Sequence, residues 1–252
     1  MNKLQSCIMV GLLSASVFGT AWAATIIERQ EMGKTQKVTL EGENVRIDSS
    51  NPNFYILMDL KKGNAYMVNG KEKRIVKLKI VGKPPTLPSQ SPQYQQPKRR
   101  SEPVKAKLVK IGNGSSIAGY PTVNYEMKAN NQVCSEESFS KQAALVPYVK
   151  DFLNAISQLS SSRQIKGMPL PPCVQANNDL EAEYLKLGMS MKTVVKGKNG
   201  NTVLYKITSI KTDVGVPSRL FRLPSYKIIS EQEMIKENMA KRNQWRREEQ
   251  RR

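Results

Sequence analysis

Cysteine and histidine are the residue types that decide which chemistry this chain can perform. Its 252 residues include Cys7, Cys134 and Cys173 but no histidine. Without an imidazole, neither a Ser-His-Asp triad nor a Cys-His pair can be assembled, and these are the commonest devices that activate a nucleophile at neutral pH. A zinc site is also disfavoured, because no cysteine belongs to a CxxC pair and zinc prefers nitrogen and sulfur ligands. The sequence therefore predicts no catalytic nucleophile and no metal centre.

Carboxylates remain as candidates for acid–base chemistry, and one glycine-rich run remains as a candidate for phosphate binding. Glu136 with Glu137, and Glu181 with Glu183, fall in segments typical of solvated turns and helix faces. The run GNGSS at 112–116 lacks the lysine and the strand-to-helix context of a phosphate-binding loop, so it predicts a turn. We therefore expect a protein that is not an enzyme and needs no cofactor. A cluster of buried, convergent carboxylates would reverse this expectation.

The N-terminus predicts export from the cytoplasm. Lys3 precedes the apolar stretch CIMVGLLSASVFG, which has the length of a signal-peptide core. Ala21 and Ala23 then form the small-x-small pattern that signal peptidase recognises, so we expect cleavage after Ala23. The apolar run is too short for a permanent membrane anchor, which is the alternative. No cysteine follows the cleavage site directly, so we expect a soluble periplasmic protein without a lipid anchor.

Export leaves Cys134 and Cys173 as the two cysteines of the mature chain. Two cysteines in an oxidising compartment usually pair, so the sequence predicts a disulfide between them, with a free reactive thiol as the alternative. In the chain-entropy model, a bond that closes about 40 residues stabilises the fold by about 4 kcal/mol.

The chain carries 40 lysines and arginines against 21 acids, a net charge of +19. Such a charge attracts nucleic acid, anionic lipid or an acidic partner. Nucleic acid is not expected here, because export removes the protein from it and the basic residues are not interleaved with stacking aromatic side chains. Phosphates of lipopolysaccharide or phospholipid are better candidates.

Short β-prone runs dominate residues 24–81 and predict a meander of strands. These runs are TIIERQE, KVTLEG, NVRID, FYILMDL and AYMVNG. In FYILMDL the apolar residues occupy both faces at period two, so we expect this strand to be covered on both sides. We predict that Phe54, Ile56 and Met58, with Met67 of the next run, form an apolar ligand face; plain core packing is the alternative.

Helical periodicity appears after further strands at KAKLVKIG, PTVNYEMKA and QVCSE. The spacing of apolar residues predicts a helix over 140–159, which Pro147 either kinks or begins. NNDLEAEYLKLG predicts a second helix, with Asn178 or Asp179 as its cap, Gly188 as its terminator and Cys173 just before it. The runs KTVVKG and TVLYKITSI then predict a hairpin around 199–200.

The tail is helical by propensity from about residue 230, with acids early and arginines late. Met234, Ile235, Met239 and Trp245 give it a thin apolar stripe among basic residues, which makes them candidates for docking on an anionic membrane surface. A solvated, partly frayed helix is the expectation that we prefer, because acids oppose the basic charge.

A family resemblance rests on SIAGYPTVNYEMKANNQVCSEESF, on the helix EYLKLGMSMK and on FRLPSYK before a charged helix. These segments resemble a bacterial periplasmic family of unknown function that is similar to the LolA/LolB lipoprotein carriers. The resemblance implies an α+β fold: a strongly curved antiparallel half-barrel whose concave face is covered by a few helices, with space for an acyl chain.

The expected organisation follows from this resemblance and from composition. Residues 1–23 form the signal peptide, 24–228 a single half-barrel domain with a proline-rich inserted loop at 83–104, and 229–252 a basic helical tail. The leading function is a non-enzymatic periplasmic carrier of an acyl chain, a lipid or another apolar ligand. The alternative is an envelope interaction module that uses the fold as a rigid platform. A continuous apolar void under the helices favours the carrier, and a filled interior favours the platform.

Overall fold

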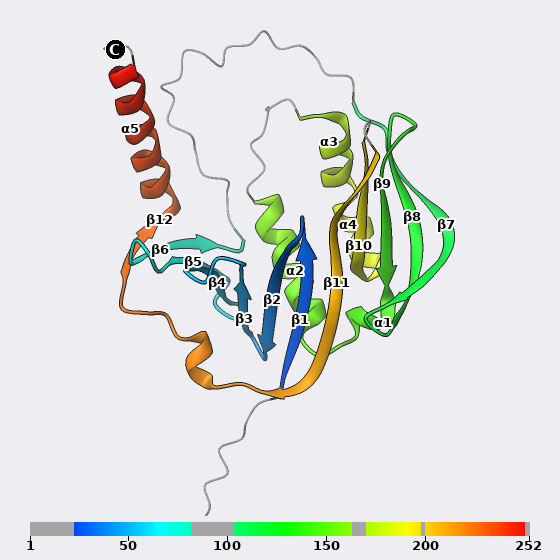
Figure 1. The fold of residues 1–252 in the computed structure, drawn as a ribbon, viewed down its shortest axis with the longest axis horizontal. Coiled ribbons are helices and arrows are strands. Elements are labelled where there is room, and N and C mark those ends of the chain that lie inside the picture. Colours follow the sequence, from blue (N-terminus) through cyan, green and yellow to red (C-terminus); the bar gives the residue numbers. More distant parts are fainter. Residues whose placement is uncertain (1–22, 82–102, 163–169, 198–199, 250–252) are drawn as a thin grey trace, which may run out of the picture.

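The computed structural model describes residues 23–81, 103–162, 170–197 and 200–249, and Figure 1 shows their arrangement. The predicted signal peptide, nearly all of the proline-rich loop and the last three residues lie outside these ranges. The strands are β1 (Ala23–Glu31), β2 (Lys34–Glu41), β3 (Asn44–Asp48), β4 (Phe54–Asp59), β5 (Asn64–Asn69), β6 (Arg74–Lys79), β7 (Ala106–Ile117), β8 (Tyr120–Ala129), β9 (Gln132–Ser140), β10 (Met189–Gly197), β11 (Gly200–Gly215) and β12 (Lys227–Ser230). The helices are α1 (Lys141–Ala144), α2 (Val149–Ser161), α3 (Pro172–Asp179), α4 (Glu181–Leu187), the 3-10 turn η2 (Ser218–Phe221) and α5 (Glu231–Glu249).

All twelve strands belong to one open, mixed sheet in the order β12-β6-β5-β4-β3-β2-β1-β11-β10-β9-β8-β7. Neighbours pair antiparallel except β12, which pairs with β6 in parallel. The two meanders predicted from the sequence, β1–β6 and β7–β9, are joined by β10 and β11, because β11 pairs with β1 while β10 pairs with β9. The expected α+β class, with a mainly antiparallel sheet and few helices, is confirmed.

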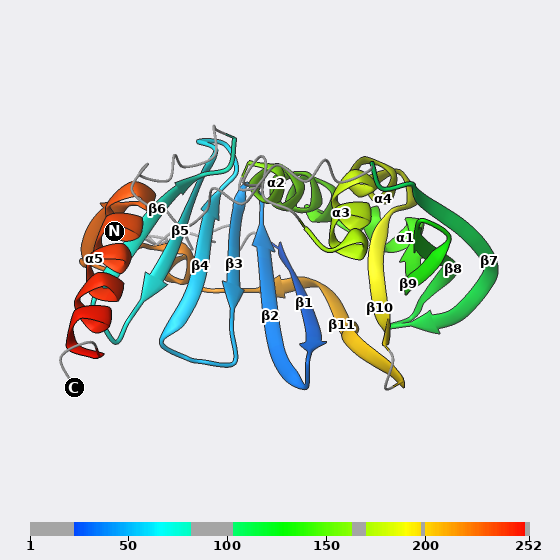
Figure 2. The same cartoon turned by 90° about the horizontal axis from the view of Figure 1, so that it is seen from above.

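The helices α1–α4 lie on one side of the sheet, and Figure 2 shows them in a row there. The larger core cluster lies between α1, α2 and the central strands, where Leu40, Val149 and Met191 are completely buried. A smaller cluster joins α3 to β8 and β9 and contains the predicted disulfide between Cys134 and Cys173. The disulfide thus fixes the helical cover to the sheet.

Two predicted helices differ from the observed ones in their boundaries. The helix expected over 140–159 is interrupted between Ala144 and Val149, since Pro147 cannot continue α1, and Tyr148 adopts a left-handed conformation.

The second predicted helix is divided into α3 and α4. Its predicted cap was wrong: α4 follows Leu180, which makes no capping bond, and the chain is already helical from Pro172, a residue suited to a first turn. Cys173 is therefore inside α3 and not before a helix. Gly188 does end α4, as expected.

Candidate functional site

Residues from two separate sequence predictions meet at one small pocket between α5 and the sheet. Phe54 of β4 and Met67 of β5, two members of the predicted ligand face, line it together with Met234, a predicted docking residue of α5. The pocket has a volume of about 160 Å³, and the full lining is Phe54, Met67, Asn69, Glu72, Arg74, Val76, Met234, Asn238 and Lys241. We call it the α5 pocket. Its apolar floor and polar rim suit one apolar side chain better than a long acyl chain.

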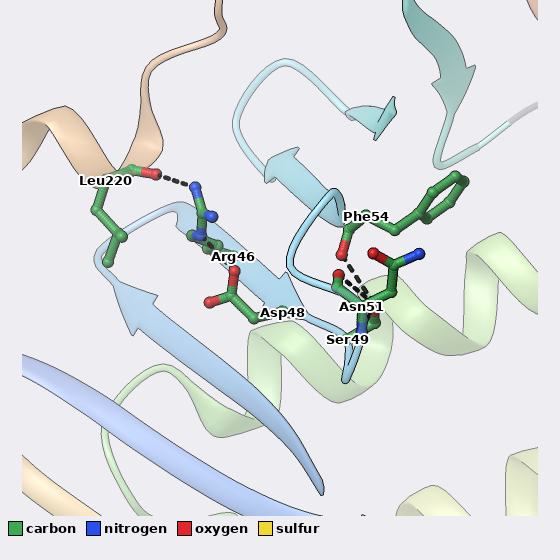
Figure 3. Close-up of polar contacts among 6 residues, drawn as sticks. All are labelled: Arg46, Asp48, Ser49, Asn51, Phe54 and Leu220. Atoms are coloured by element: carbon green, nitrogen blue, oxygen red, sulfur yellow. Dashed lines mark hydrogen bonds and ion pairs between the residues drawn. The ribbon is translucent and has the colours of Figure 1, made fainter. Parts of the chain in front are cut away.

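The turn before β4 fixes the position of Phe54. The hydroxyl of Ser49 lies 2.9 Å from the carbonyl oxygen of Phe54 and 3.0 Å from that of Asn51. The backbone N–H of Phe54 donates to the Asn51 carbonyl at 2.9 Å, and the N–H of Gly70 donates to the Asn53 carbonyl at 2.7 Å. The second bond ties the β3–β4 turn to the β5–β6 turn. Figure 3 shows the Phe54 ring pointing away from Arg46.

The opposite face of β4 is covered too, as the sequence predicted. Leu57 is 4% exposed on that face, and the guanidinium of Arg46 lies 3.9 Å from the centre of the Tyr55 ring. Arg46 also donates to Asp48 at 2.8 Å and to the carbonyl oxygen of Leu220 at 3.1 Å, which Figure 3 shows. The segment around η2 is thereby attached to the outer face of β3.

Two acidic and two basic residues lie at or beside the α5 pocket. Arg74 of β6 forms an ion pair with Glu237 of α5, and Glu72 approaches the same guanidinium at 3.9 Å. Lys241 lies one helical turn beyond Glu237 and lines the pocket. An acidic group from outside could therefore bind Arg74 or Lys241 at the rim. To reach Arg74 it would have to replace Glu237.

The remaining predicted residues lie elsewhere. Met58 is 2% exposed within the larger core cluster, and Ile56 packs against that cluster. On α5, Ile235 and Met239 are half-buried, while Trp245 is 75% exposed. The predicted apolar stripe of the tail is thus divided between a half that contacts the sheet and a half that projects from it (Figure 1).

A second hollow, of about 300 Å³, lies at the outer edge of α2. Its apolar residues include Leu60, Ile80 and Ala155, but most of the lining is polar or glycine, including Glu43 and Asp151. Neither hollow is a continuous apolar void between α2 and the central strands.

One sequence expectation about carboxylates was wrong. Glu137 was assigned to a solvated segment, yet its residue is only 5% exposed on β9. Desolvation by burial raises the pKa of its carboxyl group, and hydrogen bonds from Thr193 and Ser135 oppose that shift. Glu136 instead points to the surface and pairs with Lys196 at 3.2 Å. The run SEES gives no signal for this difference beyond strand alternation, which places neighbours on opposite faces.

Clustered ligands for a metal are not found in the described ranges, where no group of three or more cysteines or carboxylates converges. No helix described here has the length and apolarity needed to cross a membrane. The hydrogen bonds to the Glu137 carboxylate come from the hydroxyls of Ser135 and Thr193, so these partners do not supply a second carboxylate for acid–base chemistry.

Comparison with known proteins gives little beyond this geometry. No family model matches the sequence, and no curated protein matches it significantly. Among solved structures, the MucA/MucB complex of Pseudomonas aeruginosa matches with 12% identity and a TM-score of 0.34, over 81% of this chain and 57% of that one. MucB in complex with periplasmic MucA matches with 11% identity and a TM-score of 0.35, over 82% of this chain and 56% of that one. MucB alone matches with 10% identity and a TM-score of 0.35, over 81% of this chain and 57% of that one. This chain thus spans little more than half the length of those chains, and the LolA-like resemblance is left unconfirmed.

Proposed function

We propose that this protein is a non-enzymatic interaction module of the bacterial periplasm, built as a strongly curved half-barrel. Its partner is an envelope protein, and an apolar side chain of that partner enters the α5 pocket. The observation that carries the proposal is the open, side-chain-sized pocket at the sheet margin, beside a core cluster whose residues are buried against one another. A buried ligand of acyl-chain size needs a larger cavity, since ligand sites usually occupy about 300–1,000 Å³.

Export and rigidity support the same proposal. The signal-type N-terminus and the Cys134–Cys173 disulfide fit an oxidising compartment. The turns that hold Phe54 are fixed by backbone hydrogen bonds, so little side-chain or loop ordering is needed when a partner binds.

Site-specific photocrosslinking in intact producing cells tests the proposal. A photoreactive residue at Asn69, on the rim of the α5 pocket, is expected to give discrete protein adducts. The matched control position is Val203 of β11, which is 47% exposed and lies away from α5. The adducts at Asn69 should disappear when Met67→Asp is added, while circular dichroism shows that the variant remains folded. Equal adducts at Asn69 and Val203, or adducts that survive Met67→Asp, would refute the proposed docking site.

The acyl-chain carrier is the second candidate, and the hollow beside α2 is the observation that favours it. Its volume of about 300 Å³ reaches the lower end of the usual ligand range. Native mass spectrometry of protein purified from the periplasm separates the two proposals. A lipid mass adduct that is lost on substituting Leu60→Asp supports the carrier, and unliganded protein supports the interaction module.

A further inference from the structure

The C-terminal arm, defined here as residues 216–249, is attached to the sheet in an unusual way. From the end of β11 in the middle of the sheet, the chain passes across the outer face to the far edge, as Figure 1 shows in orange. On the way, its η2 turn lies against β3, where Arg46 donates a hydrogen bond to the carbonyl oxygen of Leu220. β12 then adds to β6 through four residues, and it is the only strand of the described chain that pairs in parallel.

Little of the arm is buried. Every residue from 216 to 249 is described, and among them only Ile229 is buried, at 2% exposure. Its neighbour Ile228 points outward and is 53% exposed. In α5, Met234 packs partly against the larger core cluster, but no residue of this helix is fully buried. Few apolar contacts therefore hold the arm, and segments held in this way are the first to open in a native protein.

The arm also covers the α5 pocket without filling it. The hollow of about 160 Å³ lies between α5 and the strands β4–β6, so the helix is not closely packed on Phe54 and Met67. The ion pair from Arg74 to Glu237 spans this gap. If the arm leaves, the edge of β6, the apolar floor of the pocket and the Arg74 guanidinium all become available together.

We propose that the C-terminal arm is an autoinhibitory cover, which an acidic, extended segment of a partner protein displaces. This inference rests on the proposed function and names the kind of partner. The incoming segment pairs with β6 as an added strand, with main-chain hydrogen bonds supplying affinity and alternate side chains supplying specificity. An apolar residue takes the place of Ile229, and a carboxylate takes the place of Glu237 at Arg74. β12 shows that a strand with an isoleucine opposite Val76 fits this edge, and Glu237 of α5 shows that a carboxylate can reach Arg74 from outside the strand.

Hydrogen exchange on the full-length protein is the first test, and it needs no partner. Amides of β12 are expected to exchange at least about 100-fold faster than those of β2 and β3, because they open with the arm alone. Glu237→Gln, which removes the ion pair to Arg74 and keeps the helix, should speed exchange in β12 further while leaving β2 unchanged. Equal protection of β12 and β2 would overturn the proposal.

Peptide binding in trans is the second test. The probe is a labelled peptide of residues 225–241, added to full-length protein in which Ile229→Asp and Met234→Asp release the resident arm. We expect the peptide to bind this variant at least about tenfold more tightly than it binds the wild type. Ile228→Asp is the matched control, because this side chain is exposed and its change leaves the arm in place. A peptide carrying Glu237→Lys should lose about tenfold in affinity.

The outcomes separate the two proposals. Faster exchange in β12 with peptide binding, but without crosslinks at Asn69, upholds the displaceable arm and refutes the proposed docking function. Crosslinks at Asn69 with full protection of β12 from exchange uphold the docking function and refute the displaceable arm. If size-exclusion chromatography shows that the wild type forms dimers and that Ile229→Asp with Met234→Asp abolishes them, the occupant is the arm of a second copy and the acidic partner protein is refuted.

Discussion

Removing the disulfide tests how the helical cover is held on the sheet. The perturbation is the double substitution Cys134→Ala and Cys173→Ala. The two residues are separated by 39 positions, so the bond closes a loop that contains α1, α2 and the start of α3. Without it, α3 is held on β8 and β9 by packing, which includes the buried side chains of Ala176 and Leu180.

The expected magnitude follows from the length of that loop. Closing about 40 residues removes about 13 cal/mol/K of entropy from the unfolded chain, which corresponds to about 4 kcal/mol at 25 °C. Single domains have free energies of unfolding of about 5–15 kcal/mol, so the variant loses a large part of its stability. Alanine is chosen because Cys134 is 4% exposed in an apolar cluster, where a serine hydroxyl would add a desolvation cost.

Urea unfolding followed by circular dichroism at 222 nm is the assay. The control is the wild type in reducing agent, which breaks the disulfide and keeps both cysteine side chains. Its free energy of unfolding should be close to that of the double variant. The single substitution Cys173→Ala also removes the disulfide, so its free energy of unfolding should be close to both. A fall of less than about 1 kcal/mol in the free energy of unfolding would refute the entropic reasoning, because it would mean that the unfolded chain is already restricted in this region.

Four further outcomes are expected. Gly188→Ala should lower the free energy of unfolding by about 2 kcal/mol in urea titrations, since Gly188 has φ 110° and ψ −151° and an added Cβ would lie 2.5 Å from the Ser140 carbonyl oxygen; an unchanged midpoint would contradict this. Because burial raises the pKa of Glu137, the folded state holds this proton longer than the unfolded state, so wild-type stability falls as pH rises from the ordinary value of 4.5 through the raised folded pKa. In thermal melts at pH 4–8, the melting temperature of Glu137→Gln should therefore fall less with rising pH than that of the wild type. Parallel pH profiles of the two proteins would refute this role of Glu137. Trp245, 75% exposed, should emit as a water-exposed indole and show no blue shift with anionic vesicles at low salt. Intact mass should give a chain that begins at Ala24, with two hydrogens fewer than the reduced formula because the disulfide is formed.

Several elements were predictable because their signals are local. Strand runs of period two, the interruption at Pro147 and the end of α4 at Gly188 each depend on a few neighbouring residues, and the structure has them where the sequence indicates. The pairing of Cys134 with Cys173 was also predictable, because the predicted cleavage of the signal peptide would leave no other cysteine as a partner.

The candidate site was predictable only in pieces. Apolar periodicity singled out Phe54 and Met67 on one hand and Met234 on the other, but nothing in the sequence joined the two groups. They meet because β12 pairs with β6, more than 140 residues away in the chain, and carries α5 over β4–β6. A four-residue strand has no strong local pattern, so this pairing has no sequence signal of its own.

The sequence by itself determined most of the strands, the disulfide and the absence of histidine chemistry, since these depend on residue type and short spacing. Tertiary structure alone decided that Glu137 is buried, that Val149 and Phe152 of α2 pack on the central strands and that α5 leaves a pocket at the sheet edge. The physical reason is that burial is a property of surfaces brought together over long chain separations. Which apolar faces meet, and how closely they pack, depends on the sum of many weak contacts and not on any one segment.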